Sequence, residues 1–410
     1  MKIIKFCLIV ILFLRAAYSY GQTTNTGVFT ITAGTEVSVQ DQFNNTNTGS
    51  FMNDGDLYIH KNFNNDGAFS FFQNAVNGTT YFVGNAIQEI TGSLESRFYN
   101  ITFNNATAFA AFQLKSKIHA YNTVNFSQGI VQNDVYDGEF IFENDATHRN
   151  TSNQSYVNGA VQKNGSTTFE FPIGAREKFR KASITAPISF DDEIVATYFL
   201  ENSNTKYTHN LSAGIIDLID TNEYWLVEQK NGSSNVVLTL SWDETTTSSA
   251  ILDAPKSALH ILRWDAAEGF WVDEGGIVDE NNKTVTTVAE VSGYGVFTLG
   301  TVKEDLILPG GLVVYNAVTP DEDGKNDFFF IDGIKDIPEN TMEIFNRWGV
   351  KVYETKNYNE TDNVFKGISE GRLTVRKNKK LPAGTYFYVL NYQYNSENIK
   401  KAGYLYLNSN

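Results

Sequence analysis

Three carboxylates in the N-terminal half of the chain have the residue types that glycoside chemistry needs. Asp54, Asp56 and Asp66 lie near glycines, and His60 and Lys61 stand between them in the run YIHKNF. Clustered carboxylates with a nearby base or cation can cleave glycosidic bonds. The alternative is that these acids shape turns through hydrogen bonds from their side chains to the backbone. We expect the turn-shaping role.

The other histidines and the common catalytic motifs add no support for catalysis. His119, His148, His209 and His260 are scattered without the spacing of metal ligands. The sequence contains no GxSxG elbow, HExxH pair or P-loop. We therefore predict that the chain is not an enzyme and that it acts by binding. The alternative is a secreted polysaccharide-degrading enzyme or a carbohydrate-binding accessory protein.

Tryptophans concentrate in the middle of the chain, at positions 225, 242, 264 and 271. Exposed tryptophan rings can stack on sugars, whereas tryptophans at alternating strand positions more often fill the core of a sandwich. Packing is the favoured role. Trp264 and Trp271 flank the turn DAAEGF and are the candidate ligand-binding pair.

An acidic turn near the C-terminus carries oxygen ligands of the kind that calcium prefers. Asp321, Asp323, Asn326 and Asp327 surround Gly324, and calcium takes about six to eight oxygens. The spacing matches an EF-type loop only in part. The favoured alternative is a turn in which the carboxylates accept backbone N–H groups. We therefore predict no cofactor, with a structural calcium as the candidate exception.

Strands must position these residues, because the sequence pattern is almost entirely β. Alternating apolar and polar residues bounded by Asn, Gly and Asp dominate, and a helical stripe is absent outside the N-terminal leader. The single cysteine, Cys7, lies in that leader, so the mature chain has no disulfides. An aromatic content of 14% suits a core that is stabilised without them. The predicted fold class is all-β.

A recurrent aromatic motif predicts a β-solenoid-like region over residues 22–150. The tripeptide FNN occurs at residues 43–45, 63–65 and 103–105. Units of about 20 residues are typical of solenoids, in which matching phenylalanines stack inside and corner asparagines form ladders. The alternative is a meandering sandwich. A solenoid presents a long repetitive face that suits binding to a polymer or a surface.

Residues 151–305 are predicted to form an immunoglobulin-like β-sandwich. Asn-Gly pairs at residues 158–159 and 164–165 are hairpin signals. Strand-like runs such as IVATYFL, EYWLVEQ and VVLTLSW follow, separated by Gly, Ser or Asp. The segment PGG at residues 309–311 marks a hinge before the last region.

Residues 310–410 show a dense order of strand, acidic turn, strand and glycine turn. The order is carried by VVYNAVTPDEDGKNDFFFIDGI, MEIFNRWGVKVYE, VFKGISEG, LPAGTYFYVLNYQY and KAGYLYLNSN. It resembles the gliding-motility-associated C-terminal domain of Bacteroidetes, which is the type B sorting domain of the type IX secretion system. The resemblance implies a small antiparallel β-sandwich, export through the type IX translocon, and an outer-membrane partner of the PorP/SprF type.

The family pattern falls on three segments of this region. The matching residues are Pro320, Asp323, Gly324, Asn326 and Asp327 in the acidic turn, Asn346, Arg347, Trp348 and Gly349 after the central strand, and Leu381, Pro382, Gly384, Thr385, Tyr386 and Tyr388 at the closing strand. Asp321 stands where relatives usually carry asparagine, and Phe365 where many carry tryptophan. Gly384 permits the turn that leads into the closing strand.

The N-terminus independently predicts secretion. Residues 1–21 have a basic start, an apolar run too short to span a bilayer, and small residues before Gln22, as in a signal peptide. The mature chain is then expected to lack a transmembrane segment. With 47 acidic and 32 basic residues, the net charge of −15 disfavours nucleic acid as a partner. We predict an extracellular or cell-surface protein, with adhesion to a polysaccharide or other surface as its role.

Overall fold

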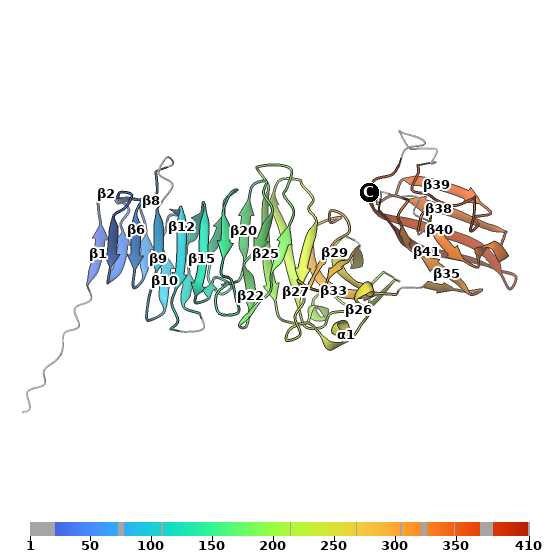
Figure 1. The fold of residues 1–410 in the computed structure, drawn as a ribbon, viewed down its shortest axis with the longest axis horizontal. Coiled ribbons are helices and arrows are strands. Elements are labelled where there is room, and N and C mark those ends of the chain that lie inside the picture. The colour runs from blue at the N-terminus through green and yellow to red at the C-terminus, as the bar shows by residue number, and fades with distance from the viewer. Residues whose placement is uncertain are drawn as a thin grey trace, which may run out of the picture.

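The computed structural model is an elongated β-protein in which strands follow one another from β1 to β41 (Figure 1). The residues that the structure describes are 21–72, 78–107, 110–213, 215–267, 269–303, 306–320, 326–347, 349–369 and 380–408. Apart from Gly21, the predicted signal peptide lies outside these ranges. Among the described residues, no helix is long and apolar enough to cross a bilayer.

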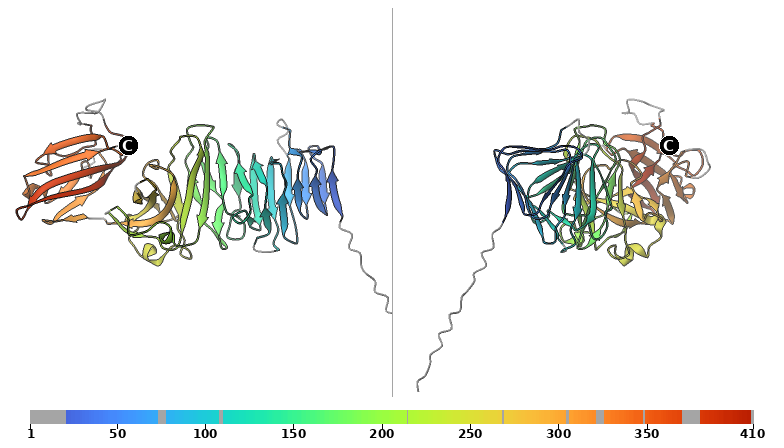
Figure 2. Two further views of the ribbon diagram at one scale, coloured as in Figure 1. Left: turned by 180° about the vertical axis from the view of Figure 1, so that it is seen from behind. Right: turned by 60° about the vertical axis from the view of Figure 1, so that its left-hand side comes forward.

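The N-terminal part is a parallel β-solenoid of about six turns, and each turn adds one strand to each of three sheets (Figures 1 and 2). Sheet A contains β1 (Gln22–Asn25), β4 (Gln42–Asn45), β7 (Phe63–Asn65), β10 (Gln88–Thr91), β13 (Phe112–Leu114) and β16 (Val131–Gln132). Sheet B contains β2 (Val28–Ile31), β5 (Ser50–Asn53), β8 (Ala68–Ser70), β11 (Ser96–Phe98), β14 (Lys117–Ala120) and β17 (Glu139–Phe142). Sheet C contains β3 (Glu36–Val39), β6 (Asp56–Ile59), β9 (Thr79–Phe82), β12 (Asn100–Asn104), β15 (Thr123–Gln128) and β18 (Thr147–Arg149). The predicted solenoid is therefore confirmed.

The FNN repeat explains how the solenoid is filled. Successive side chains of a strand point to opposite faces, so Phe43 and Asn45 point inward while Asn44 points outward. The ring of Phe43 stacks on that of Phe63 in the next turn, with centroids 5.1 Å apart. The Asn45 amide donates to Oδ1 of Asn65 at 2.8 Å. Stacked rings and an asparagine ladder thus form the core of the first turns, as the repeat predicted.

Parallel pairing continues beyond residue 150. Sheet A gains β19 (Val157–Asn158) and β22 (Ile173–Ala175), with β23 (Lys178–Phe179) as its antiparallel edge, and sheet B gains β20 (Val161–Asn164). The strands around Asn158 and Gly159 pair with β16 and β17 instead of with each other. The hairpin predicted there is therefore wrong. The Asn-Gly pair instead forms a corner of the solenoid, in which Gly159 has a φ of 132°.

The middle region continues sheet B with antiparallel strands and adds a second sheet. Sheet B goes on through β25 (Glu193–Phe199), β27 (Tyr224–Asn231), β33 (Gly295–Val302), β29 (Leu259–Asp265) and β30 (Phe270–Gly275), and β26 (Ile216–Ile219) pairs with β33. Sheet D contains β21 (Phe169–Phe171), β24 (Ala182–Ile184), β28 (Leu238–Ser241), β32 (Thr284–Thr286) and β31 (Ile277–Asp279). The short helices of this region are η1 (Ser203–Thr205), α1 (Ser249–Leu252) and η2 (Lys256–Ala258). Residues from both sheets, such as Trp225 and Leu240, join the same buried cluster as the solenoid phenylalanines, so solenoid and sandwich share one core.

A buried ion pair joins the two sheets of the sandwich. The Arg180 guanidinium donates to both carboxylate oxygens of Glu223, at 2.9 and 3.1 Å, and to the backbone oxygen of Ser241 at 2.5 Å. The Tyr198 hydroxyl also donates to Glu223, at 2.6 Å. Each buried charge is therefore paired and hydrogen-bonded, which burial in an apolar interior requires.

The C-terminal region has antiparallel sheets and a core of its own (Figure 1). One sheet contains β34 (Leu306–Leu308), β35 (Leu312–Tyr315) and β37 (Phe330–Asp332), and η3 (Ile334–Asp336) follows. The other contains β36 (Ala317–Val318), β41 (Glu397–Leu407), β40 (Gly384–Tyr394), β38 (Asn340–Phe345) and β39 (Lys351–Lys356). Tyr404 of β41 packs in one apolar cluster with Leu262 and Trp271 of the sandwich, so the two parts touch.

Candidate functional site

Two of the three carboxylates that the sequence singled out, Asp54 and Asp66, lie at bends between strands. Asp54 is buried, and its Oδ1 accepts the backbone N–H of Phe72 at 2.9 Å. Asp66 accepts the N–H and the hydroxyl of Ser93, at 2.9 and 2.8 Å. Hydrogen bonds from Asn64 and Ser93 lower the pKa of Asp66. Both acids hold neighbouring backbone in place, which is the turn-shaping role expected of them.

The residues between these acids are also engaged locally. Asp56 is half-buried in β6 of sheet C, in register with Glu36 of the preceding turn. His60 Nε2 lies 3.1 Å from the hydroxyl of Ser38. The ammonium of Lys61 forms an exposed ion pair with Asp41 at 2.8 Å. The structure therefore does not assemble a catalytic pair from these side chains.

A groove with a volume of about 630 Å³ lies instead on sheet B, between β8 and β11. Its lining includes small residues such as Gly67, Ala68 and Ser70. The two strands share a single register pair, Phe69 with Ser96, so the ladder is short at this point. Gly67 and Ala68 carry no side chain large enough to fill the space beside this short ladder. The groove is thus a local opening in an otherwise regular sheet.

Charged side chains line one wall of this groove. They are Glu95, Arg97 and Lys117. Arg97 donates from Nε and Nη2 to one oxygen of Glu95, at 3.0 and 2.6 Å. These bonds lower the pKa of Glu95, so the carboxylate is ionised at neutral pH. Lys117 reaches Glu139 on the next strand at 3.2 Å. The ion pairs are partly exposed, and such pairs contribute only about 0–1 kcal/mol, so a ligand can replace them.

His119 connects this wall to a second carboxylate. Its Nδ1 lies 2.6 Å from Oε1 of Glu143, and its Nε2 lies 3.4 Å from Oε2 of Glu95. Burial opposes ionisation of Glu143, but the hydrogen bond and charge of His119, with Asn164 and Lys163, outweigh it and lower its pKa. His119 thus lies between two carboxylates, and its Nε2 is shielded from solvent.

This cluster was missed in the sequence because its members are far apart there. The sequence showed His119 as an isolated histidine, 24 residues from each of its two carboxylates. One turn of the solenoid has about that length, so parallel pairing brings His119 beside Arg97 of the preceding strand. The repeat length was the signal that could have found the cluster. Among the described residues, no group of three or more His, Cys, Asp or Glu side chains could hold a metal ion.

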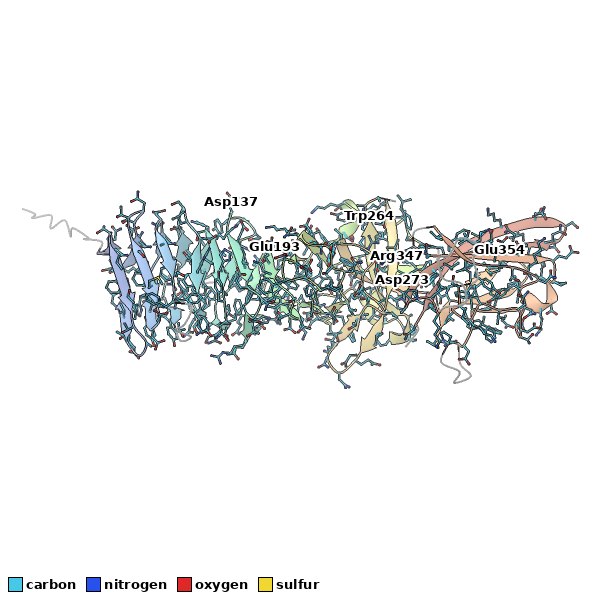
Figure 3. The ribbon with its side chains drawn as sticks, turned by 90° about the horizontal axis from the view of Figure 1, so that it is seen from above. Asp137, Glu193, Trp264, Asp273, Arg347 and Glu354 are labelled. Carbon is cyan, nitrogen blue, oxygen red and sulfur yellow. The ribbon has the colours of Figure 1, made fainter. Side chains whose placement is uncertain are left out.

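Of the two candidate tryptophans, only Trp264 reaches the surface, and it is half-buried. Trp271 is fully buried, and its indole N–H donates to the backbone oxygen of Tyr207 at 3.2 Å. The two rings meet edge to face at 5.7 Å. Figure 3 labels Trp264 in the sandwich, and Glu354 lies farther along the molecule in the C-terminal region. This packing matches the favoured core role of the tryptophans.

The described residues of the C-terminal motif make turns and fill the core. The N–H of Gly349 donates to the backbone oxygen of Asn346 at 2.9 Å, and Gly349 has a φ of 72°, which a glycine adopts without strain. Gly384 has a φ of 146° at the start of β40, and Tyr386 and Tyr388 beyond it are buried. These residues therefore shape the fold of the region.

Other motif residues support the same framework. Leu381 is buried, and the oxygen of Pro382 accepts the Tyr386 hydroxyl at 2.9 Å. In the acidic turn, Asn326 has a φ of 54°, and its backbone oxygen accepts the N–H of Thr319 at 2.7 Å. Four members of the motif and of the candidate calcium site lie outside the described residues; these are Asp321, Asp323, Gly324 and Trp348.

Comparison with known families identifies one match. Residues 312–407 match the CHU_C Type IX secretion signal domain. The match covers the C-terminal region, and it confirms the predicted type B sorting domain. No curated protein and no solved structure matches the chain.

Proposed function

We propose that this chain, which carries a type IX secretion signal domain at residues 312–407, is an exported protein that binds an extended polysaccharide along its solenoid. The binding is non-catalytic, and the groove on sheet B is the central part of the site. The signal domain supports export by the type IX secretion machinery. The final location outside the cell or on its surface, and an outer-membrane partner of the PorP/SprF type, belong to this proposal.

The observation that carries the proposal is the groove with its charged wall. A parallel sheet repeats one outward side chain every ~4.8 Å along the solenoid axis. Arg97, His119 and Gln162 lie in one such row of sheet B, with the buried Ile141 between His119 and Gln162, and Lys117 and Glu139 lie in another. A linear polymer lying along the axis therefore meets hydrogen-bonding groups on several turns. Sugar hydroxyls and carboxylates can replace the exposed ion-pair partners of Arg97 and Lys117.

Affinity electrophoresis tests this site. The mature chain is run through gels containing xylan, pectin or alginate, and pull-down on cellulose covers an insoluble polymer. We expect retardation by at least one polymer, and about tenfold weaker binding for Arg97→Ala or Lys117→Ala, because a hydrogen bond to a charged group contributes about 1.5–3 kcal/mol. Lys61→Ala is the matched control, since Lys61 also forms an exposed ion pair but lies off the groove. Equal binding by all three variants would exclude the groove as the polysaccharide-binding site.

A second candidate function is cleavage of the bound polymer. It is favoured by the position of His119 between Glu95 and Glu143 beside the groove. Reducing-sugar release from a bound polymer, abolished by His119→Gln while binding persists, would establish an enzyme. Binding without product supports the non-catalytic role. Loss of product in an Asp54 variant would carry less weight, because Asp54 is buried and holds the backbone of Phe72.

A further inference from the structure

The solenoid ends at its N-terminal side on three strands without an outer neighbour. Strands β1, β2 and β3 are the last members of sheets A, B and C, and no strand among the described residues pairs with their outer edges. The opposite end of the solenoid is different. There β20 pairs antiparallel with β25, and the sandwich closes the core. One end is therefore capped and the other is open.

Glycines at equivalent corners show how open this end is. A Cβ added to Gly49 would lie 2.7 Å from the backbone oxygen of Asn25, and one added to Gly67 would lie 2.3 Å from the oxygen of Gly49. In both cases the preceding turn occupies the space. A Cβ added to Gly27 would meet nothing within 4 Å. At Gly27, no described residue occupies the space that a preceding turn would fill.

At the open end, β2 exposes apolar side chains, and the first turn is almost free of charge. Phe29 is in register with the buried Phe51 and stacks on it at 5.1 Å, yet it is 43% exposed because no described strand precedes β2 in the sheet. Val28 beside it is 84% exposed. Glu36 is the sole charged residue between positions 22 and 39. Natural edge strands are usually protected by charges, prolines or bulges, whereas β1 and β2 of this edge contain neither charges nor prolines.

We propose that two copies of the chain join head to head at this open end. Strand β2 of one copy pairs antiparallel with β2 of the other across a two-fold axis, and the exposed Phe29 rings close over each other. The pairing supplies hydrogen-bond partners for the strand edges and covers the apolar end. Such an interface uses the same patch on both copies and so stops at two.

Charge and topology select a second copy in this orientation. The chain has a net charge of −15, so two copies repel each other over most of their surface. This repulsion is weak at the first turn, because Glu36 is its single charged residue. Head-to-tail stacking would need three free strand edges at the other end of the solenoid, where β20 already pairs with β25 and the sandwich follows (Figure 1). Head-to-head contact is the arrangement that remains.

Sedimentation velocity of the mature chain, with the leader removed, tests the proposal. We expect a species of twice the chain mass that dissociates on dilution. Val28→Lys should weaken the association at least tenfold, and so should Gly27→Lys, because neither side chain clashes within one copy. Ile188→Lys is the matched control, since Ile188 is 83% exposed and lies in the sandwich. Circular dichroism verifies that each variant folds.

Charge reversal gives a second and independent measurement. Mixing Val28→Lys with Val28→Glu should restore a dimer that neither variant forms alone, since the opposite charges then meet in one interface. Three outcomes would overturn the proposal. They are a mature chain that stays monomeric at high concentration, assemblies larger than two copies, and an association that Ile188→Lys weakens as much as Val28→Lys does.

Discussion

Asn45 provides the sharpest test of how the solenoid is held together. It is fully buried in β4. Its amide nitrogen donates to Oδ1 of Asn65 at 2.8 Å and to the backbone oxygen of Ala68 at 2.9 Å. Its Oδ1 accepts the amide of Asn25 at 2.8 Å. Replacing Asn45 by alanine removes all three bonds and leaves the buried Oδ1 of Asn65 without this donor.

The expected loss follows from the number of buried groups left unpaired. A buried donor or acceptor that loses its partner costs about 1–3 kcal/mol. In Asn45→Ala the buried Asn65 oxygen loses this donor, and the Ala68 oxygen and the Asn25 amide lose part-buried bonds, so we expect a loss of about 3 kcal/mol in local stability. Asn44→Ala is the control on the same strand. Asn44 points outward, is half-buried, and accepts one bond from Asn64 at 2.8 Å, so its loss should stay below about 1 kcal/mol.

Native-state hydrogen exchange followed by mass spectrometry is the suitable assay, because repeat proteins can open turn by turn. We expect the exchange protection of β4 and β7 to fall about a hundredfold in Asn45→Ala, since each factor of ten corresponds to about 1.4 kcal/mol. Asn44→Ala should change it less than tenfold. Equal effects of the two substitutions would refute the idea that the inward asparagine ladder stabilises these turns.

Three further predictions concern other parts of the molecule. Gly67→Ala should lower the melting temperature strongly, because the new Cβ would lie 2.3 Å from backbone oxygens. Gly27→Ala should leave the melting temperature nearly unchanged, because a Cβ there meets nothing within 4 Å. Similar melting temperatures for the two variants would contradict this prediction. Burial, followed by the charge of Glu223, raises the pKa of Asp220 to about 7, so Asp220 stays protonated to a higher pH in the folded state than in the unfolded state. Its contribution to the free energy of unfolding is complete below about pH 4 and is lost as the pH rises through 7, by up to about 4 kcal/mol. Asp220→Asn should flatten this pH dependence of the free energy of unfolding, measured by urea titration at each pH. An unchanged pH dependence would exclude Asp220 as its source. A chain ending at Pro309 should be retained in the periplasm on cell fractionation, and its efficient release would show that the signal domain is dispensable.

The sequence predicted the features that depend on local spacing. The FNN recurrence predicted the solenoid because each turn must place a phenylalanine inside and an asparagine at the corner. The glycine and asparagine positions of the C-terminal region indicated its turns, and Gly349 and Gly384 do have positive φ values. The Asn-Gly pair at Asn158 was misread as a hairpin. The same backbone preference serves a hairpin turn and a solenoid corner, and only the pairing partner distinguishes them.

The amino-acid sequence by itself determined the β-class, the solenoid repeat and the signal domain, because alternation, period and turn residues act within a few residues of one another. The tertiary structure decided which distant side chains meet. His119 lies beside Glu95 and Glu143 because parallel register aligns residues one turn apart. The groove at Gly67 exists because one ladder is short, and a strand register is set by the packing of all turns together.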